Sequence, residues 1–110
     1  ERIDLFNVNR KEYDKRRVFD ENGNVSYDLD LNVHRNLAQH KIAPHLHLWQ
    51  NGEKEKGYKM PSKKQVENNK DIILKVYSER YYDEYINAYN EKDKSKRQKI
   101  LEDLTRSWYK

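Results

Sequence analysis

The sequence predicts an α+β domain, in which a small antiparallel β-sheet of N-terminal hairpins is followed by two α-helices packed on one face. Two Asn-Gly pairs, Asn22-Gly23 and Asn51-Gly52, each lie between strand-like segments in the first half of the chain. Asn-Gly is the preferred hairpin turn because both central residues adopt positive φ angles. From Pro61 onward the apolar residues follow the helical period instead. The order of these patterns therefore places the sheet first and the helices second.

Apolar and ionisable residues alternate in the strands around these turns. The strand over 25–31 places Asp28 and Asp30 on one face and apolar residues on the other. The strand after Pro44 places His45 and His47 on one face, with leucines on the opposite face. Successive strand residues point to opposite sides of a sheet. If the two strands share a sheet, these four ionisable groups line one water-facing polar surface.

The second half begins with a helix-start signal. Ser62 followed three residues later by Gln65 matches a capping box, which predicts a helix from Lys63 to Tyr89. Some apolar residues fall outside its main stripe, so this helix is either covered on two sides or broken near its middle. Asp93 or Ser95 begins the final helix. Its predicted apolar stripe consists of Ile100, Leu101, Leu104 and Trp108.

Composition limits the class of protein. The 110 residues fit one domain, and an aromatic content of 12% argues against disorder although 38% of the residues are charged. The absence of cysteine excludes disulfides and thiolate metal sites. No apolar run is long enough to cross a membrane, so no membrane partner is expected. Because the chain starts at Glu1 without a methionine, we expect residues 1–110 to be a domain excised from a longer protein.

All four histidines occur in one short stretch with the spacing H-x5-H-x4-H-x-H. They are His34, His40, His45 and His47. Histidine exchanges protons near neutral pH, and its neutral ring binds metals. The clustering predicts that any chemistry of this protein takes place in this segment.

The first interpretation of the cluster is metal-free acid–base chemistry on a phosphodiester, which needs no cofactor. His45 and His47 would transfer the protons, and Asp28 and Asp30 would orient their rings. Arg35 or Lys41 would contact the phosphate and stabilise its charge. A net charge of +4 and many aromatic residues suit single-stranded RNA, so a nuclease acting on RNA, or on another nucleic acid, is the leading hypothesis.

Two other interpretations compete with the nuclease. The four histidines are candidate ligands of a metal ion such as Zn²⁺, with an aspartate as a further ligand. Alternatively, His45 and His47 hydrogen-bond Asp28 and Asp30 and tie two strands together without turnover. If the cluster is such a network or a zinc clip, the domain would be a non-catalytic structural or interaction module; loss of nucleic-acid cleavage on chelation would instead indicate a catalytic metal.

Segment 17–49 resembles a domain at the C-terminus of head-morphogenesis (minor capsid) proteins and toxin-like proteins from phages and prophages of Gram-positive bacteria. The resemblance depends on a basic-aromatic strand, an Asp-x-x-Gly turn, an Asp-x-Asp strand and a Pro-His-x-His-x-Trp ending. These are Arg17–Phe19, Asp20 to Gly23, Asp28 to Asp30 and Pro44 to Trp49. The family pattern has glycine after the first histidine, where this chain has Arg35 after His34.

The resemblance implies a mobile-element origin and attachment to a larger phage or toxin protein. It places the domain in the bacterial cytoplasm or in the phage particle. It also adds weight to the nuclease hypothesis, because such modular proteins carry nuclease-like effector domains.

Overall fold

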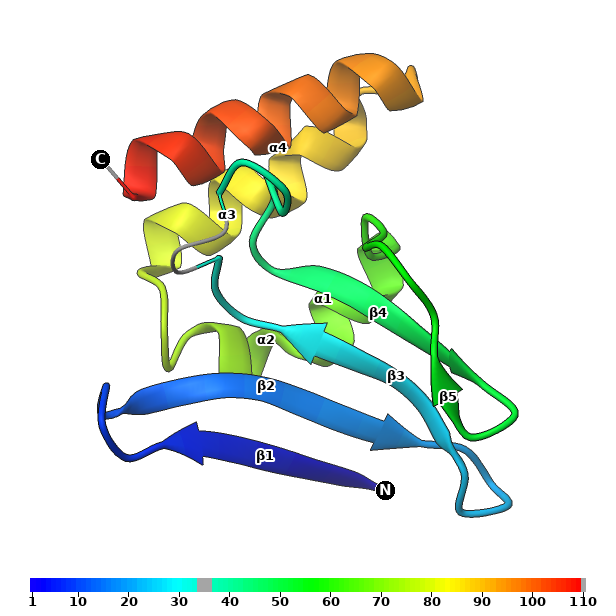
Figure 1. Ribbon diagram of the computed structural model, residues 1–110. Coiled ribbons are helices and arrows are strands. Elements are labelled where there is room, and N and C mark those ends of the chain that lie inside the picture. Colours follow the sequence, from blue (N-terminus) through cyan, green and yellow to red (C-terminus); the bar gives the residue numbers. More distant parts are fainter. Residues whose placement is uncertain (34–36, 110) are drawn as a thin grey trace.

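The computed structural model describes residues 1–33 and 37–109, and its first half is a five-stranded antiparallel sheet with the strands in chain order (Figure 1). The α+β prediction is confirmed. The sheet has one strand more at its N-terminal edge than the hairpin signals predicted. Its strands are β1 (Arg2–Asn7), β2 (Glu12–Phe19), β3 (Val25–Asp30), β4 (His45–Gln50) and β5 (Glu53–Lys54).

Both Asn-Gly pairs lie in turns between strands, but only Asn51-Gly52 has the predicted positive φ at both residues. Gly23 has a φ of 81° between β2 and β3, and Asn51 and Gly52 have φ angles of 54° and 77° between β4 and β5. The Asp20 carboxylate closes the first turn by accepting hydrogen bonds from the backbone N–H groups of Asn22 and Asn24, both at 2.9 Å. The two turns therefore connect β2 to β3 and β4 to β5 as antiparallel hairpins.

The second half forms four α-helices and a 3₁₀ turn. They are α1 (Lys63–Asn68), α2 (Lys70–Ile73), α3 (Glu79–Asn87), η1 (Ala88–Asn90) and α4 (Lys94–Trp108). Ser62 and Gln65 form the predicted capping box, and Asp93 caps α4. In the described part of the chain, none of the helices combines the length and apolar character needed to span a membrane.

The helix expected over 63–89 is broken. This is one of the two outcomes predicted from the apolar residues that lie outside its main stripe. At Asn69 the side-chain amide donates to the Gln65 carbonyl at 2.7 Å and to the Tyr27 hydroxyl at 3.1 Å, competing with continued helix geometry. At Ser78 a new helix starts, because its hydroxyl accepts from the Tyr81 N–H. The breaks let the helices follow the twisted sheet.

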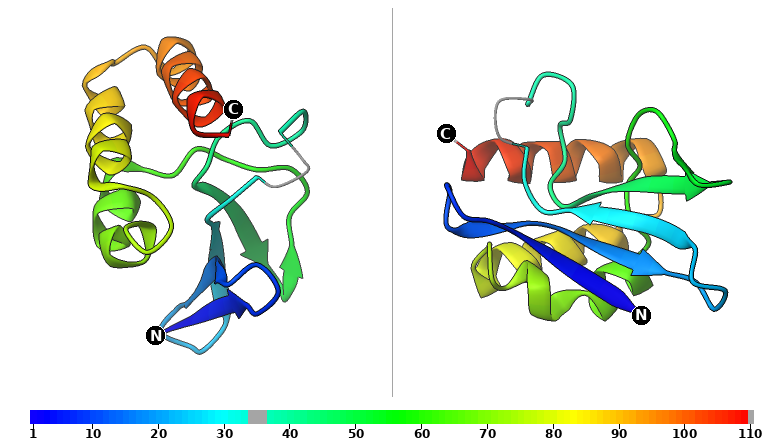
Figure 2. Two further views of the ribbon diagram at one scale, coloured as in Figure 1. Left: turned by 90° about the vertical axis from the view of Figure 1, so that its left-hand side faces the viewer. Right: turned by 60° about the horizontal axis from the view of Figure 1, so that its bottom comes forward.

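The helices lie on one side of the sheet (Figure 2). Leu29 of β3 and Leu46 of β4 point towards them and are buried. α4 packs outside α3 and also reaches the loop before β4, where the Thr105 hydroxyl accepts from the Ala43 N–H at 3.1 Å. The opposite face of β3 and β4, which carries Asp28, Asp30, His45 and His47, therefore faces away from the helices.

A tyrosine column fixes the helices to the loops that flank β4. The side chains at the helical spacing of four donate to backbone carbonyls, each at 2.5–2.6 Å. The pairs are Tyr77 with Leu31, Tyr81 with Ala43, Tyr85 with Pro44 and Tyr89 with Pro61. Two of these carbonyls belong to the two residues directly before His45. The column therefore anchors the chain at the entry to the histidine strand.

Candidate metal centre

The structure brings the predicted histidines and aspartates onto one face of β3 and β4. In the antiparallel register Asp28 lies opposite His47, and Asp30 lies opposite His45. The expectation of a water-facing surface is wrong, since Asp28 and His45 are 0% and 1% exposed. Segment 55–58 and the loop before β4 cover this face, with the Tyr58 ring 5.2 Å from the His45 ring.

Two histidine rings and one aspartate converge on a single point. The Nε2 atoms of His45 and His47 lie 3.2 Å apart. Asp30 Oδ2 lies 3.5 Å from His45 Nε2 and 3.2 Å from His47 Nε2. We call this triangle of atoms, from His45, His47 and Asp30, the His–Asp centre.

Backbone carbonyls set the tautomer of both rings. His45 Nδ1 lies 2.7 Å from the Ile42 carbonyl oxygen, and His47 Nδ1 lies 2.8 Å from that of Gly57. A carbonyl oxygen only accepts, so each Nδ1 carries a hydrogen and donates it. In the neutral rings both Nε2 atoms therefore present lone pairs to each other and to the Asp30 carboxylate.

Burial and neighbouring charges act in opposite directions on the ionisable groups of the centre. It lowers the pKa of His47 despite the nearby Asp30 carboxylate, and it also lowers the pKa of His40. Burial alone would raise the pKa of Asp30, but contacts with His45 and Lys15 bring that pKa to about 2. At neutral pH the His–Asp centre thus contains an ionised carboxylate beside a neutral His47 ring.

The dimensions of the centre fit a zinc ion. With zinc–ligand bonds of about 2.0–2.1 Å, neighbouring ligand atoms of a tetrahedral site lie about 3.3–3.4 Å apart. The three measured separations, 3.2, 3.2 and 3.5 Å, bracket that value. Ligating histidines usually donate their second ring N–H to a carbonyl or carboxylate, as both do here.

His40 is close to the centre but is oriented differently. Its ligand nitrogen lies within 4.8 Å of those of His45 and His47. Its ring is stacked on His45 with an interplanar angle of 8° and a centroid distance of 5.0 Å. Two stacked parallel rings cannot both direct in-plane lone pairs at one ion. His40 would therefore have to rotate to become the fourth ligand.

Asp28 is not part of this centre, although its strand position suggested that it would orient a histidine. Its carboxylate accepts two hydrogen bonds from Arg17, at 2.8 and 3.1 Å, and one from Trp49 Nε1 at 3.1 Å. The Arg17 guanidinium also lies over the Trp49 ring at 4.8 Å. Asp28 thus anchors β2 to the end of β4, while Asp30 alone contacts the histidines.

Of the two predicted phosphate contacts and the predicted ligand His34, only Lys41 falls among the described residues. His34 and Arg35 lie outside the described residues. Lys41 is exposed and lines a hollow with Glu102 and Arg106 of α4. The charged groups that do approach the centre are Lys15 and Lys54.

Sequence reasoning missed these two lysines. Lys15 Nζ lies 3.6 Å from Asp30 Oδ1, and Lys54 Nζ lies 3.8 Å from Asp28 Oδ2. The signal was present, because Lys15 and Arg17 alternate on β2 and so share a face with Asp28 and Asp30. To use this signal, the register of β2, β3 and β4 has to be known.

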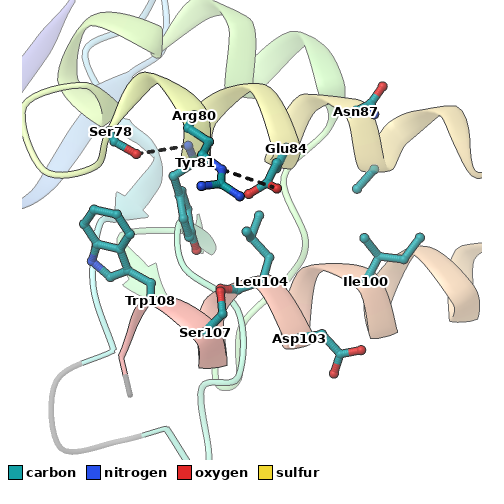
Figure 3. Close-up of a pocket in the computed structure, with 11 residues that line it drawn as sticks. Ser78, Arg80, Tyr81, Glu84, Asn87, Ile100, Asp103, Leu104, Ser107 and Trp108 are labelled. Carbon is teal, nitrogen blue, oxygen red and sulfur yellow. Dashed lines mark hydrogen bonds and ion pairs between the residues drawn. The ribbon is translucent and has the colours of Figure 1, made fainter.

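A separate hollow lies between α3 and α4, remote in the sequence from the histidines (Figure 3). Tyr81, Leu104 and Trp108 form its apolar wall. Arg80 and Glu84 form an ion pair at its rim, with 3.9 Å between their charged atoms. None of the described residues that line this hollow is a histidine, so the His–Asp centre is the better candidate for chemistry.

Comparison of the chain with models of protein families, with curated proteins and with solved structures finds no match.

Proposed function

We propose that this domain binds one zinc ion through His45 Nε2, His47 Nε2 and Asp30 Oδ2. The observation that carries the proposal is the convergence of these three lone-pair atoms within 3.5 Å of one another. Because both Nδ1 atoms already donate to carbonyls, the rings have no neutral tautomer that would hydrogen-bond Nε2 to Nε2 without losing one of those bonds. A divalent cation satisfies all three atoms at once.

The same distances disfavour metal-free proton transfer. An acid and a base that act on a phosphodiester must lie on either side of the phosphorus atom. Two Nε2 atoms 3.2 Å apart leave no room for a phosphate between them. The nuclease hypothesis in its cofactor-free form would need His45 and His47 to separate.

A structural hydrogen-bond network remains the main competitor. It would require one ring to become an imidazolium that donates to Asp30. For His47, burial works against this by lowering its pKa. Zinc also explains why the centre gathers three parts of the chain. β3 supplies the carboxylate, β4 supplies the rings, and segment 55–58 supplies the Gly57 carbonyl that orients His47.

The test is a zinc titration of chelator-treated protein at neutral pH, with metal content measured by elemental analysis. We expect one zinc per chain, and loss of that zinc in His47→Gln and in Asp30→Asn. Asp14→Asn is the matched control, because this partly buried carboxylate on β2 accepts from Asn7 and Asn32 and lies away from the centre. Cobalt(II) in place of zinc gives a spectroscopic readout of tetrahedral coordination.

The proposal fails if the parent protein binds no zinc under these conditions. It also fails if His47→Gln and Asp30→Asn bind zinc as Asp14→Asn does. Circular dichroism of each variant separates loss of the site from loss of the fold.

We further propose, as a second candidate, that the ion serves phosphodiester cleavage as part of a phage- or toxin-associated protein. The favouring observation is the convergence of three ligand atoms, since catalytic zinc sites combine three protein ligands with an exchangeable water. The resemblance of segment 17–49 to phage head-morphogenesis proteins supports the same choice. Incubation with labelled RNA and DNA tests it: cleavage should stop on chelation, return with zinc and be absent in His47→Gln.

A further inference from the structure

Three cations surround the two aspartates on the polar face of the sheet. Arg17 binds Asp28 directly, whereas Lys15 and Lys54 lie 3.8 Å from Asp28 Oδ2. Lys15 also lies 3.6 Å from Asp30 Oδ1, an oxygen that accepts no hydrogen bond from the described residues. Charge-assisted hydrogen bonds are shorter, about 2.7–2.9 Å. The lysines are therefore near the carboxylates without closing tight ion pairs.

The local charge is positive even before a metal binds. Three cations face two carboxylates, and a divalent ion in the His–Asp centre would add two further positive charges. With Asp28 fully buried and Lys15 and Lys54 only 23% and 35% exposed, solvent screens this excess incompletely. The loaded site would be stabilised by an anion at its surface.

We propose that the zinc-loaded centre binds a phosphate group, which takes the fourth position on the ion and is held by Lys15 and Lys54. This inference rests on the proposed zinc site. A phosphate group has enough oxygen acceptors to serve an ion and two ammonium groups together. The group would come from inorganic phosphate or from a phosphodiester of single-stranded nucleic acid, and the chemistry of recognition is the same for both.

Binding is measured for the zinc-loaded and the metal-free protein, with inorganic phosphate in one arm and a short single-stranded RNA in the other. We expect zinc to strengthen binding, and Lys54→Gln to weaken it about tenfold, which corresponds to the loss of about 1.4 kcal/mol. Lys15→Gln should have a similar effect. Lys41→Gln is the matched control, an exposed lysine that lines a hollow against α4.

The two arms identify the source of the phosphate. RNA that binds much more tightly than inorganic phosphate, and is displaced by it, indicates a phosphodiester ligand, whereas equal affinities indicate the free ion. The inference is overturned if zinc leaves the affinity unchanged, or if Lys54→Gln and Lys15→Gln bind as Lys41→Gln does. Zinc content is measured on every sample, so a failed phosphate site with one zinc per chain is distinguished from failure of the zinc site.

Discussion

The tyrosine column and the His–Asp centre are two buried polar regions that the same fold completes to different degrees. In the column each hydroxyl donates to a backbone carbonyl, so the polar atoms are matched within the protein. In the His–Asp centre, the Nδ1–H of each ring donates to a backbone carbonyl. The two Nε2 atoms and Asp30 Oδ2 are all acceptors, and they face one another. The polar groups of the column are hydrogen-bonded within the protein, whereas the three acceptor atoms of the centre are the ligands of the proposed zinc ion.

This difference teaches how to separate structural from functional polar groups in one chain. Buried polar atoms in folded proteins almost always have partners, and an unmatched set needs a specific explanation. The tyrosine column is explained by the loops it holds, among them the Ala43 and Pro44 carbonyls that precede His45. For the centre, the proposed zinc ion would be the partner of the three acceptor atoms. By holding the two residues before His45, the tyrosine column positions the strand that carries the His–Asp centre.

The largest expected effect comes from breaking the column at Tyr85. Tyr85 is 1% exposed and donates to the Pro44 carbonyl at 2.6 Å. Tyr85→Ala should lower the free energy of unfolding by about 3–5 kcal/mol through the cavity it leaves. Tyr85→Phe keeps the ring and should cost about 1–3 kcal/mol by leaving a buried carbonyl unmatched. Urea unfolding measures both, with Asp83→Ala on the exposed side of α3 as control.

A folded Tyr85→Phe should still bind one zinc, since it removes no ligand. If Tyr85→Phe is as stable as the control, the column does not stabilise the fold as its hydrogen bonds indicate.

The fold was predictable where local signals were strong. Asn-Gly turns and the alternation around Asp28 and His45 identified β3, β4 and their turns, and Ser62 marked the start of α1. β1 was missed because its residues Ile3 and Leu5 are 49% and 39% exposed at the sheet edge, so no buried face imposes a clear alternation. The helix breaks depend on tertiary partners, such as the Tyr27 hydroxyl that binds Asn69.

The second prediction concerns the free energy that zinc adds. A ligand at 100 times its dissociation constant stabilises the native state by about 2.7 kcal/mol. Zinc should therefore raise the unfolding free energy of the parent protein by about that amount, and His47→Gln should abolish the gain. His40→Ala should retain most of it, because the His40 ring is stacked on His45 rather than directed at the centre. Thermal melts with zinc and with chelator measure the difference.

An equal gain in His47→Gln would mean that zinc binds elsewhere. Complete loss in His40→Ala would mean that the ring rotates to become a ligand and that the centre is closed to other molecules.

The site was predictable as a segment but not as a ligand set. Strand alternation placed Asp28 and Asp30 on the histidine face, yet it could not tell them apart. The Asp28 carboxylate accepts hydrogen bonds from Arg17 and Trp49 and is therefore not available to the histidines. This follows only from the pairing of β2, β3 and β4. The carbonyls of Ile42 and Gly57 carry no signal in the sequence, because every residue has one.

The smallest effect, and the sharpest contrast between the two regions, is the pH dependence of stability in the metal-free protein. The pKa of Asp30 is about 2 in the fold, against an ordinary value of 3.8. The unfolded chain therefore takes up its proton first, so about 2 kcal/mol of stability that is present above pH 3.8 disappears as the pH falls towards 2. Burial lowers the pKa of His40 and His47, so a further decline should begin as the pH falls below about 6.5.

The column should respond at the opposite end of the pH scale. Burial raises the pKa of Tyr85 well above 10, so its contribution is complete below pH 10 and decreases as the pH rises beyond that value. Urea unfolding across pH measures both limbs. Asp30→Asn should flatten the acid limb and leave the alkaline limb intact, whereas Asp14→Asn should change neither. An unchanged acid limb in Asp30→Asn would show that the neighbours of Asp30 do not keep it ionised. The tyrosine column and the His–Asp centre would then not differ in the way that their pKa shifts indicate.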